Sequence, residues 1–393
     1  MSMSVWATST DQAIRIHNRL TGNLPSTEAL DDMQAILDGG GTTYDVARFA
    51  IDNDYDHSFY NVTLKNWSAP WTNRDFDVFA DLNDYIATVV GFVRDNDDLD
   101  FRGVLYEDIL YTGPSSLTSY AANNNLHYTE LEAELELNGD PGFSLKDDLE
   151  RRVQSAVNPD LAGGGASGVV TSRAGARAFL IAGTNRAAFR FTMLNHLCLD
   201  MEQVHDVSRP SDRIRQDVSR SPGGDSEIFL TSCIGCHSGM DPMTQALAYH
   251  HYEVPNRDDD PTGADGFIVY TPGTVQSKYF NNNATFPAGY ITPDDRWNNY
   301  WREGKNTALG WDEALPGAGQ GASGMFQELA HTQAFAQCHI QRVFKAVCLR
   351  DPADSDDVVE VNAMVAEFTE PSGSREGDMK HVFARSADYC KGE

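Results

Sequence analysis

Two cysteines and a histidine near the middle of the chain constrain most tightly what it can fold into. They form the segment Cys233-Ile-Gly-Cys236-His237 in a chain of 393 residues. Two thiols three residues apart on a helical turn can add to the two vinyl groups of one porphyrin, and the adjacent imidazole then reaches the iron from one face. The spacing predicts a covalently attached c-type haem, anchored by Cys233 and Cys236, with His237 as the proximal iron ligand.

A redox dithiol, a zinc site and a tight disulfide fit this segment less well than haem does. With 6 cysteines and 11 histidines in the chain, the triplet is expected by chance in about 0.003 places. A redox dithiol needs a β-α-β context, which the sequence lacks. A zinc site needs a second pair of Cys or His ligands, and none has the required spacing. All three remain the alternatives to haem.

The motif does not determine the ligand on the opposite face of the iron. Met325, on a predicted C-terminal helix, is our candidate distal ligand. A Met ligand suits a high-potential electron carrier, and a His ligand a lower potential. An open position would instead permit peroxide or dioxygen chemistry. The remaining remote candidates are His250, His251, His331 and His339.

Other residues near the motif are weaker candidates for contact with the haem. Met240 and Met243 follow His237 too closely to reach the opposite face, so we expect them to pack in the core. Basic residues can pair with haem propionates, and tryptophans can pack on the ring. A solvated basic face and core tryptophans are the competing interpretation. The residues concerned are Arg296, Arg302, Lys305, Trp297, Trp301 and Trp311.

Four cysteines lie outside the motif: Cys198, Cys338, Cys348 and Cys390. An even remainder in an exported protein permits two disulfides, with three alternative pairings. The competing interpretation is buried free thiols, which pack as small hydrophobic side chains. The sequence does not choose between them.

The charge balance is strongly acidic, with 30 Lys and Arg against 58 Asp and Glu and a formal net charge of −28. This argues against nucleic acid and anionic membranes as partners. It would steer a basic redox partner towards the protein. Acidic loops at 95–100 and 258–265 could hold calcium, but neither has the spacing of an EF-hand. We expect solvated turns there, with calcium as the weaker interpretation.

Apolar residues recur at helical spacing along much of the chain, while strand patterns are sparse. We predict a mainly α, multi-helix protein with an embedded c-type haem segment and long irregular loops. Its parts are an N-terminal helical domain (1–115), a middle helical region with a Gly/Pro-rich linker (116–225), and the haem segment with a C-terminal helical domain (226–393). No run of 18 apolar residues occurs, so no transmembrane helix is expected.

Several helices are predicted individually from their spacing and caps. We expect helices over 77–93, 173–199 and 325–350, the last as one helix or two. Thr292, followed by Pro and two Asp residues, predicts a helix start. That helix would place Trp297 and Trp301 on one face.

Segments spread along most of the chain resemble planctomycete-type surface cytochrome c proteins. The most specific is 233–242, which resembles their Cys-x-x-Cys-His-x-x-Met/Ile-Asp-Pro segment; 19–26, 197–198 and 335–350 are shorter matches. The sequence departs from the family pattern at two places. The family has Gly before Arg where this chain has Cys348-Leu349, and it often has Gly where this chain has Met243. The resemblance implies an exported, mostly helical, haem-binding protein and says little about a substrate.

Together these features predict a monohaem c-type cytochrome that transfers single electrons in the periplasm or at the cell surface. One alternative is a haem enzyme, a peroxidase or oxygenase, with an open distal site. Another is a surface or assembly protein with a structural haem, and the chain length favours these two alternatives. The first residues show no signal peptide. We therefore expect that translation starts further upstream or that the chain is a mature form.

Overall fold

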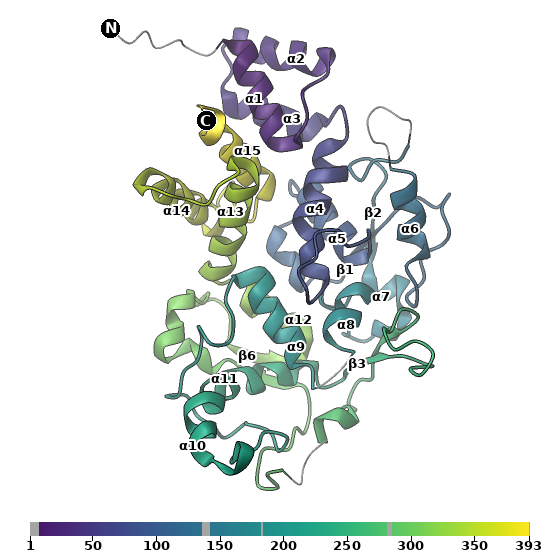
Figure 1. Ribbon diagram of the computed structural model, residues 1–393, viewed down its shortest axis with the longest axis vertical. Coiled ribbons are helices and arrows are strands. Elements are labelled where there is room, and N and C mark those ends of the chain that lie inside the picture. Colours follow the sequence, from purple (N-terminus) through teal and green to yellow (C-terminus); the bar gives the residue numbers. More distant parts are fainter. Residues whose placement is uncertain (1–7, 136–141, 182–183, 281–284, 393) are drawn as a thin grey trace.

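The computed structural model describes residues 8–135, 142–181, 184–280 and 285–392. Within these ranges the protein is mainly helical, with a few short strands (Figure 1). This confirms the mainly α part of the predicted fold class. None of the described helices is both long and apolar enough to cross a membrane.

The two ends of the chain pack together. Helices α1, α2 and α3 contact one another, and the last helix, α15, packs on α1 and α3 at one end of the molecule (Figure 1). Thr8 and Asp11 form a capping box at the start of α1, and Gly22 ends that helix in the left-handed conformation. The bounds are α1 (Ser9–Thr21), α2 (Thr27–Asp38), α3 (Thr43–Asn53) and α15 (Met379–Tyr389).

The middle of the molecule is built around α5, which is buried from Asp84 to Val93. Helix α5 begins later than the predicted 77–93 because the Asn83 side chain accepts hydrogen bonds from the N–H groups of Tyr85 and Ile86. The predicted helix 173–199 is divided into α8 and α9, and α9 continues into a π-helical turn, Met193–Leu197. The bounds are α4 (Lys65–Ser68), α5 (Asp84–Arg94), α6 (Leu126–Ala133), α7 (Gln154–Val157), α8 (Arg173–Phe179) and α9 (Arg186–Thr192).

Three antiparallel two-stranded sheets brace the loops of the described chain. Their registers pair Ile109 with Val153, His250 with Tyr270, and Arg296 with Gln320. None of these sheets has the parallel strands of a β-α-β unit. The bounds are β1 (Ile109–Thr112), β2 (Glu150–Val153), β3 (His250–Glu253), β4 (Phe267–Tyr270), β5 (Arg296–Asn298) and β6 (Ala318–Gln320).

The prediction of a helix that starts at Thr292 is wrong. This segment forms β5 and then a 3₁₀ turn, Tyr300–Arg302. Trp297 is buried on β5, and its indole packs directly over Gly319 of β6. A tertiary contact between a large ring and a residue without a side chain therefore overrides the local cap signal.

The C-terminal part contains two helices where 325–350 was predicted as one or two. They are separated before Gln333, where the Thr332 hydroxyl accepts a hydrogen bond from the Phe335 N–H. One main hydrophobic cluster contains residues from Ala13 to Cys390, so all three predicted parts contribute to it, and their boundaries stay predictions. The bounds are α12 (Gly321–Ala330), α13 (Gln333–Cys348) and α14 (Ser355–Thr369).

Candidate haem-binding site

The motif lies on continuous helix at the end of the molecule opposite α1–α3 (Figure 1). The short helix α10 (Ser226–Ile228) leads into a π-helical turn, Phe229–Cys233, which runs directly into α11 (Ile234–Thr244). Asp225 starts this run, since its side chain accepts a hydrogen bond from the Glu227 N–H. Cys233, Cys236 and His237 therefore follow one another without an intervening loop.

The six cysteines divide into two groups. Disulfides join Cys198 to Cys338 and Cys348 to Cys390, which selects one of the three pairings left open by the sequence. Cys233 and Cys236 are free and partly exposed. The tight disulfide between them is not formed, and both motif thiols remain available.

Both motif thiols lie in partly apolar surroundings. The Cys236 thiol donates a hydrogen bond to the Met201 carbonyl oxygen at 3.4 Å, and burial raises its pKa. Cys233 packs against a small apolar cluster of Ile214, Val218 and Phe229. These apolar contacts suit a hydrophobic ligand beside the motif.

A buried carboxylate holds the His237 ring. Its Nδ1 lies 3.1 Å from Oδ1 of Asp241, one turn further along α11, and the Asp241 side chain is completely buried. Burial alone would raise the pKa of Asp241, but Arg186, His237 and Arg215 together hold it well below its usual value. Asp241 is therefore an ionised acceptor, so Nδ1 carries the proton and donates it. The lone pair is then on Nε2, as iron ligation requires.

The Nε2 side of His237 is open. The side chain is 20% exposed, and Nε2 has no hydrogen-bond partner within the described chain. Two free thiols, an apolar wall and a histidine with a free, oriented nitrogen are the features that a c-type haem needs. The residues present fit that group.

A second layer of charge supports Asp241. Arg186 donates from Nε to Asp241 at 2.7 Å and from Nη1 to Asp217 at 2.6 Å. The main-chain N–H of Arg215 adds a bond to Asp241 at 3.3 Å. Sequence patterns alone did not reveal this network. The spacing of four residues between His237 and Asp241 was a usable signal, but Arg186 and Asp217 come from distant segments.

No family model, curated protein or solved structure matches this chain. The resemblance carried by 233–242 and the shorter segments therefore stays a prediction. In the part of the chain that the structure describes, no group of three or more His, Cys, Asp or Glu side chains could hold a metal ion. An iron porphyrin needs fewer protein ligands, because the ring nitrogens supply the equatorial ones.

Several carboxylates of the two acidic loops are engaged with protein partners. Asp95 accepts hydrogen bonds from Arg94 and the Tyr111 hydroxyl. Asp97 pairs with Lys380, and Asp260 accepts from main-chain N–H groups of its own loop. Each of these three carboxylates would have to exchange these partners for calcium.

Most of the candidate distal ligands are buried or already bonded, whereas His251 on β3 is partly buried and its ring forms no hydrogen bond with another described residue. Met325 is completely buried on α12 within the main core, and its role as a ligand stays a prediction. The His339 ring bonds His196 at 3.1 Å. His250 Nε2 bonds the Gly165 carbonyl oxygen at 2.8 Å, and His331 Nε2 lies 3.2 Å from the Tyr106 hydroxyl. The Nδ1 atoms of His250 and His339 have no hydrogen-bond partner among the described residues, so these two rings could bind a metal through Nδ1 without losing the bonds at Nε2.

The basic residues proposed near the propionates also have partners. Arg302 pairs with buried Glu328, and Arg296 pairs with Asp294 at the surface. Lys305 Nζ lies 3.4 Å from the Gln203 carbonyl oxygen, in the segment that follows Met201. Lys305 is close enough to Cys236 for its charge to lower the pKa of the thiol, against the larger effect of burial.

Trp301 packs against the motif helix itself. A Cβ on Gly239 would lie 1.9 Å from Trp301 Nε1, so this position on α11 must be glycine. His205 similarly covers Gly235, between the two motif cysteines. Because both positions lack a side chain, the rings of Trp301 and His205 pack directly against the backbone of α11.

Proposed function

We propose that the protein is a monohaem c-type cytochrome that transfers single electrons outside the cytoplasm. The observation that carries this proposal is the division of the cysteines. Four are joined in disulfides, while Cys233 and Cys236 stay free beside a histidine with an open nitrogen. Since the other four cysteines form disulfides, the two free thiols of the motif need a separate explanation. Thioether attachment to a haem is one such explanation.

Each motif residue has a distinct role in the proposal. Cys233 and Cys236 anchor the porphyrin, and His237 Nε2 binds the iron. Asp241 fixes the ring orientation and makes the imidazole a more basic ligand. A haem bound here supplies a one-electron redox couple. Ile228 and Leu230, which are 43% and 56% exposed just before the motif, are apolar surface that a bound porphyrin would shelter from water.

The two disulfides support a location outside the cytoplasm. Disulfides form and persist in oxidising compartments and are rare where thiols are kept reduced. Cytochrome maturation is completed in the same compartments. The disulfides and the motif therefore favour the same location, the periplasm or the cell surface.

One observation favours a haem enzyme with an open distal site as the second candidate. His250, His331 and His339 are all hydrogen-bonded elsewhere. If Met325 also stays in the core and His251 does not bind the iron, the sixth position is free for a small molecule. A spectrum of the reduced protein with carbon monoxide separates the two functions. An unchanged, low-spin spectrum supports the electron carrier, and carbon monoxide binding with rapid peroxide reaction supports the enzyme.

The attachment itself is tested by pigment retention. The chain is produced in a host competent for cytochrome maturation, denatured, extracted with acidic acetone and weighed by mass spectrometry. We expect the wild type to retain the pigment and the double variant Cys233→Ala/Cys236→Ala to lose it. The matched control is Cys348→Ala/Cys390→Ala, which also removes two cysteines but should retain the pigment. A colourless wild-type chain of unmodified mass would overturn the proposal.

A further inference from the structure

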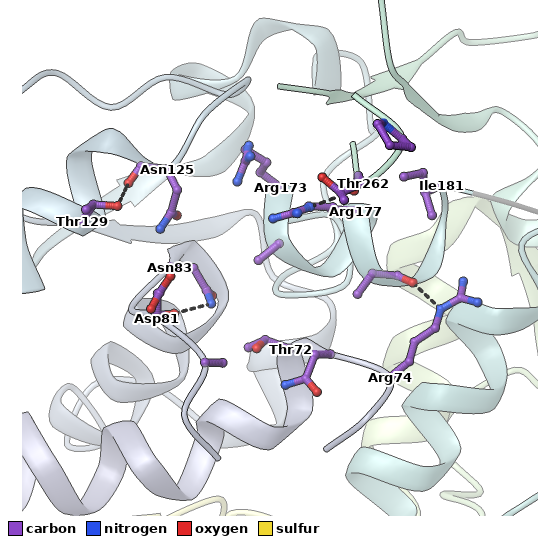
Figure 2. A pocket seen from close by; sticks show the side chains of 15 residues that line it. Thr72, Arg74, Asp81, Asn83, Asn125, Thr129, Arg173, Arg177, Ile181 and Thr262 are labelled. Carbon is purple, nitrogen blue, oxygen red and sulfur yellow. Dashed lines mark hydrogen bonds between the residues drawn. The ribbon is translucent and has the colours of Figure 1, made fainter. Parts of the chain in front are cut away.

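A cavity of about 600 Å³ opens between the start of α5, helices α6 and α8, and the loop before β4 (Figure 2). Residues from four segments line it: 72–83, 125–129, 173–181 and 261–262. None of these residues belongs to the haem motif or to its charge network. The volume is in the range of small-molecule sites and exceeds what a single ion needs.

Three arginines line this cavity on a chain whose net charge is −28. They are Arg74, Arg173 and Arg177, and none forms an ion pair with a carboxylate within the described ranges. Each instead donates to a main-chain carbonyl: Arg74 to Ala178 at 2.6 Å, Arg177 to Thr262 at 3.1 Å, and Arg173 to Ala264. A guanidinium has five N–H donors, so these single bonds leave most of their donors unused.

Arg173 is the decisive residue. Its side chain is only 5% exposed, and its buried Nε has no partner. The nearby Asp84 carboxylate accepts from the main-chain N–H groups of Arg173 and Ala174 instead of from the guanidinium. Asp84 is close enough for its charge to interact with that of Arg173, but a buried guanidinium donor without an acceptor is still costly. The Nε atom of Arg173 therefore lacks an acceptor that an anionic ligand in the cavity could supply.

The polar neighbours of the cavity do not supply that acceptor. The Thr72 and Thr129 hydroxyls donate to carbonyl oxygens of their own segments, and Asn83 is used in capping α5. Asp81 lines the cavity across from Arg173 and Arg177, which project from α8 (Figure 2). One carboxylate against three guanidiniums leaves the cavity positively charged.

We propose that this cavity binds a small, hydroxylated aliphatic oxyanion through Arg173 and Arg177. Guanidinium groups match carboxylate and phosphate oxygens in paired hydrogen bonds. No aromatic residue is among the described residues that line the cavity, so an aromatic ring or nucleobase has no stacking platform. The Asn125 side-chain oxygen and the threonine hydroxyls suit the hydroxyl groups of such a ligand. The ligand class is therefore a sugar acid or a sugar phosphate.

Isothermal titration calorimetry of the full chain tests this proposal. The probes are gluconate for the carboxylate class and glucose 6-phosphate for the phosphate class, with neutral glucose and inorganic phosphate for comparison. We expect at least one of the two hydroxylated anions to bind more tightly than inorganic phosphate, and glucose not to bind. The stronger of the two anions identifies the class. Absence of binding by both at about 10 mM would overturn the proposal.

Variants of the arginines make the test specific to the cavity. Arg177→Gln, which changes a partly exposed residue, should weaken binding at least about tenfold through loss of charged hydrogen bonds. Arg173→Gln should do the same, and if it fails to fold, Arg177→Gln still decides. The matched control is Arg190→Gln, because Arg190 pairs with Asp200 at the surface outside the cavity. Equal affinity in all three variants would overturn the assignment, whatever the outcome of the haem experiment.

Discussion

His237 is one member of a buried chain of charges. Its Nδ1 donates to Asp241, Asp241 accepts from Arg186, and Arg186 also binds Asp217. Each buried charge has an opposite charge in contact, so the network is satisfied internally. Such a support fixes the ring and its basicity together. The consequence can be measured at single residues.

Replacing Asp241 by Asn should raise the reduction potential of the haem-loaded protein. The neutral amide makes the His237 imidazole a less basic ligand, which stabilises the oxidised iron less. The substitution also removes one counter-charge of Arg186, so we expect the free energy of unfolding to fall by about 3 kcal/mol. Potentiometric titration and urea denaturation measure the two effects.

The control for this prediction is Asp217→Asn. Asp217 also binds Arg186 but does not contact His237, so this variant should lose stability while the potential moves much less. Equal shifts of potential in both variants would show that net charge near the site, and not the hydrogen bond to Nδ1, controls it. An unchanged potential in both would remove the tuning role of Asp241.

At the scale of elements, the β3–β4 hairpin depends on a histidine that must stay neutral. Burial lowers the pKa of His250 to about 4, and its Nε2 bonds the Gly165 carbonyl oxygen. The unfolded chain takes up a proton near pH 6.5, while the folded chain resists it until about pH 4. Stability is therefore full above pH 6.5 and falls by about 3 kcal/mol as the pH drops to 4.

His250→Gln should flatten this part of the pH profile. Glutamine keeps an N–H donor for Gly165 but does not titrate, so the loss of stability between pH 6.5 and 4 should shrink by about one proton's contribution. Urea denaturation midpoints measured across this range provide the comparison. An unaltered slope in the variant would assign the acid sensitivity to other buried groups, such as His196 and His339.

A disulfide links the end of α13 to the end of α15. Helix α15 is the one that packs on the N-terminal helices. Cys348 and Cys390 are 42 residues apart in sequence, and closing a loop of this length stabilises the fold by about 4 kcal/mol in the chain-entropy model. Cys348→Ala/Cys390→Ala should lower the free energy of unfolding by that order, as measured in urea without reductant. Loss of less than about 1 kcal/mol would mean that packing alone holds α15 in place.

The elements that sequence predicted well are those whose signals are local. Helix α13 lies within the predicted stretch 325–350, because apolar spacing and the cap at Thr332 are signals within that segment. The helix expected at Thr292 failed because Trp297 packs on Gly319, more than twenty residues away. The motif could be found for the same local reason, while the contact of Arg186 with Asp241 and the pairing of the cysteines depend on tertiary packing.

At the scale of the whole molecule, the excess of acidic residues should influence how fast the haem exchanges electrons with charged partners. With a formal net charge of −28, long-range attraction should speed encounters with cationic partners and slow those with anionic ones. Raising the ionic strength screens both effects. The rate of electron exchange with a cationic ruthenium complex should therefore fall with added salt, and the rate with anionic ferricyanide should rise. Stopped-flow spectroscopy measures both rates.

A matched pair of variants separates local from global charge in this prediction. Glu202 is exposed and lies close enough to Cys236 to raise the pKa of its thiol, whereas Glu28 is exposed on α2 at the other end of the molecule (Figure 1). Glu202→Gln and Glu28→Gln change the net charge equally. Because screening limits the attraction to roughly 10 Å at 0.1 M salt, only Glu202→Gln should slow the cationic reaction. Equal slowing by both variants would mean that the total charge steers the partner and that no local acidic surface guides it to the motif.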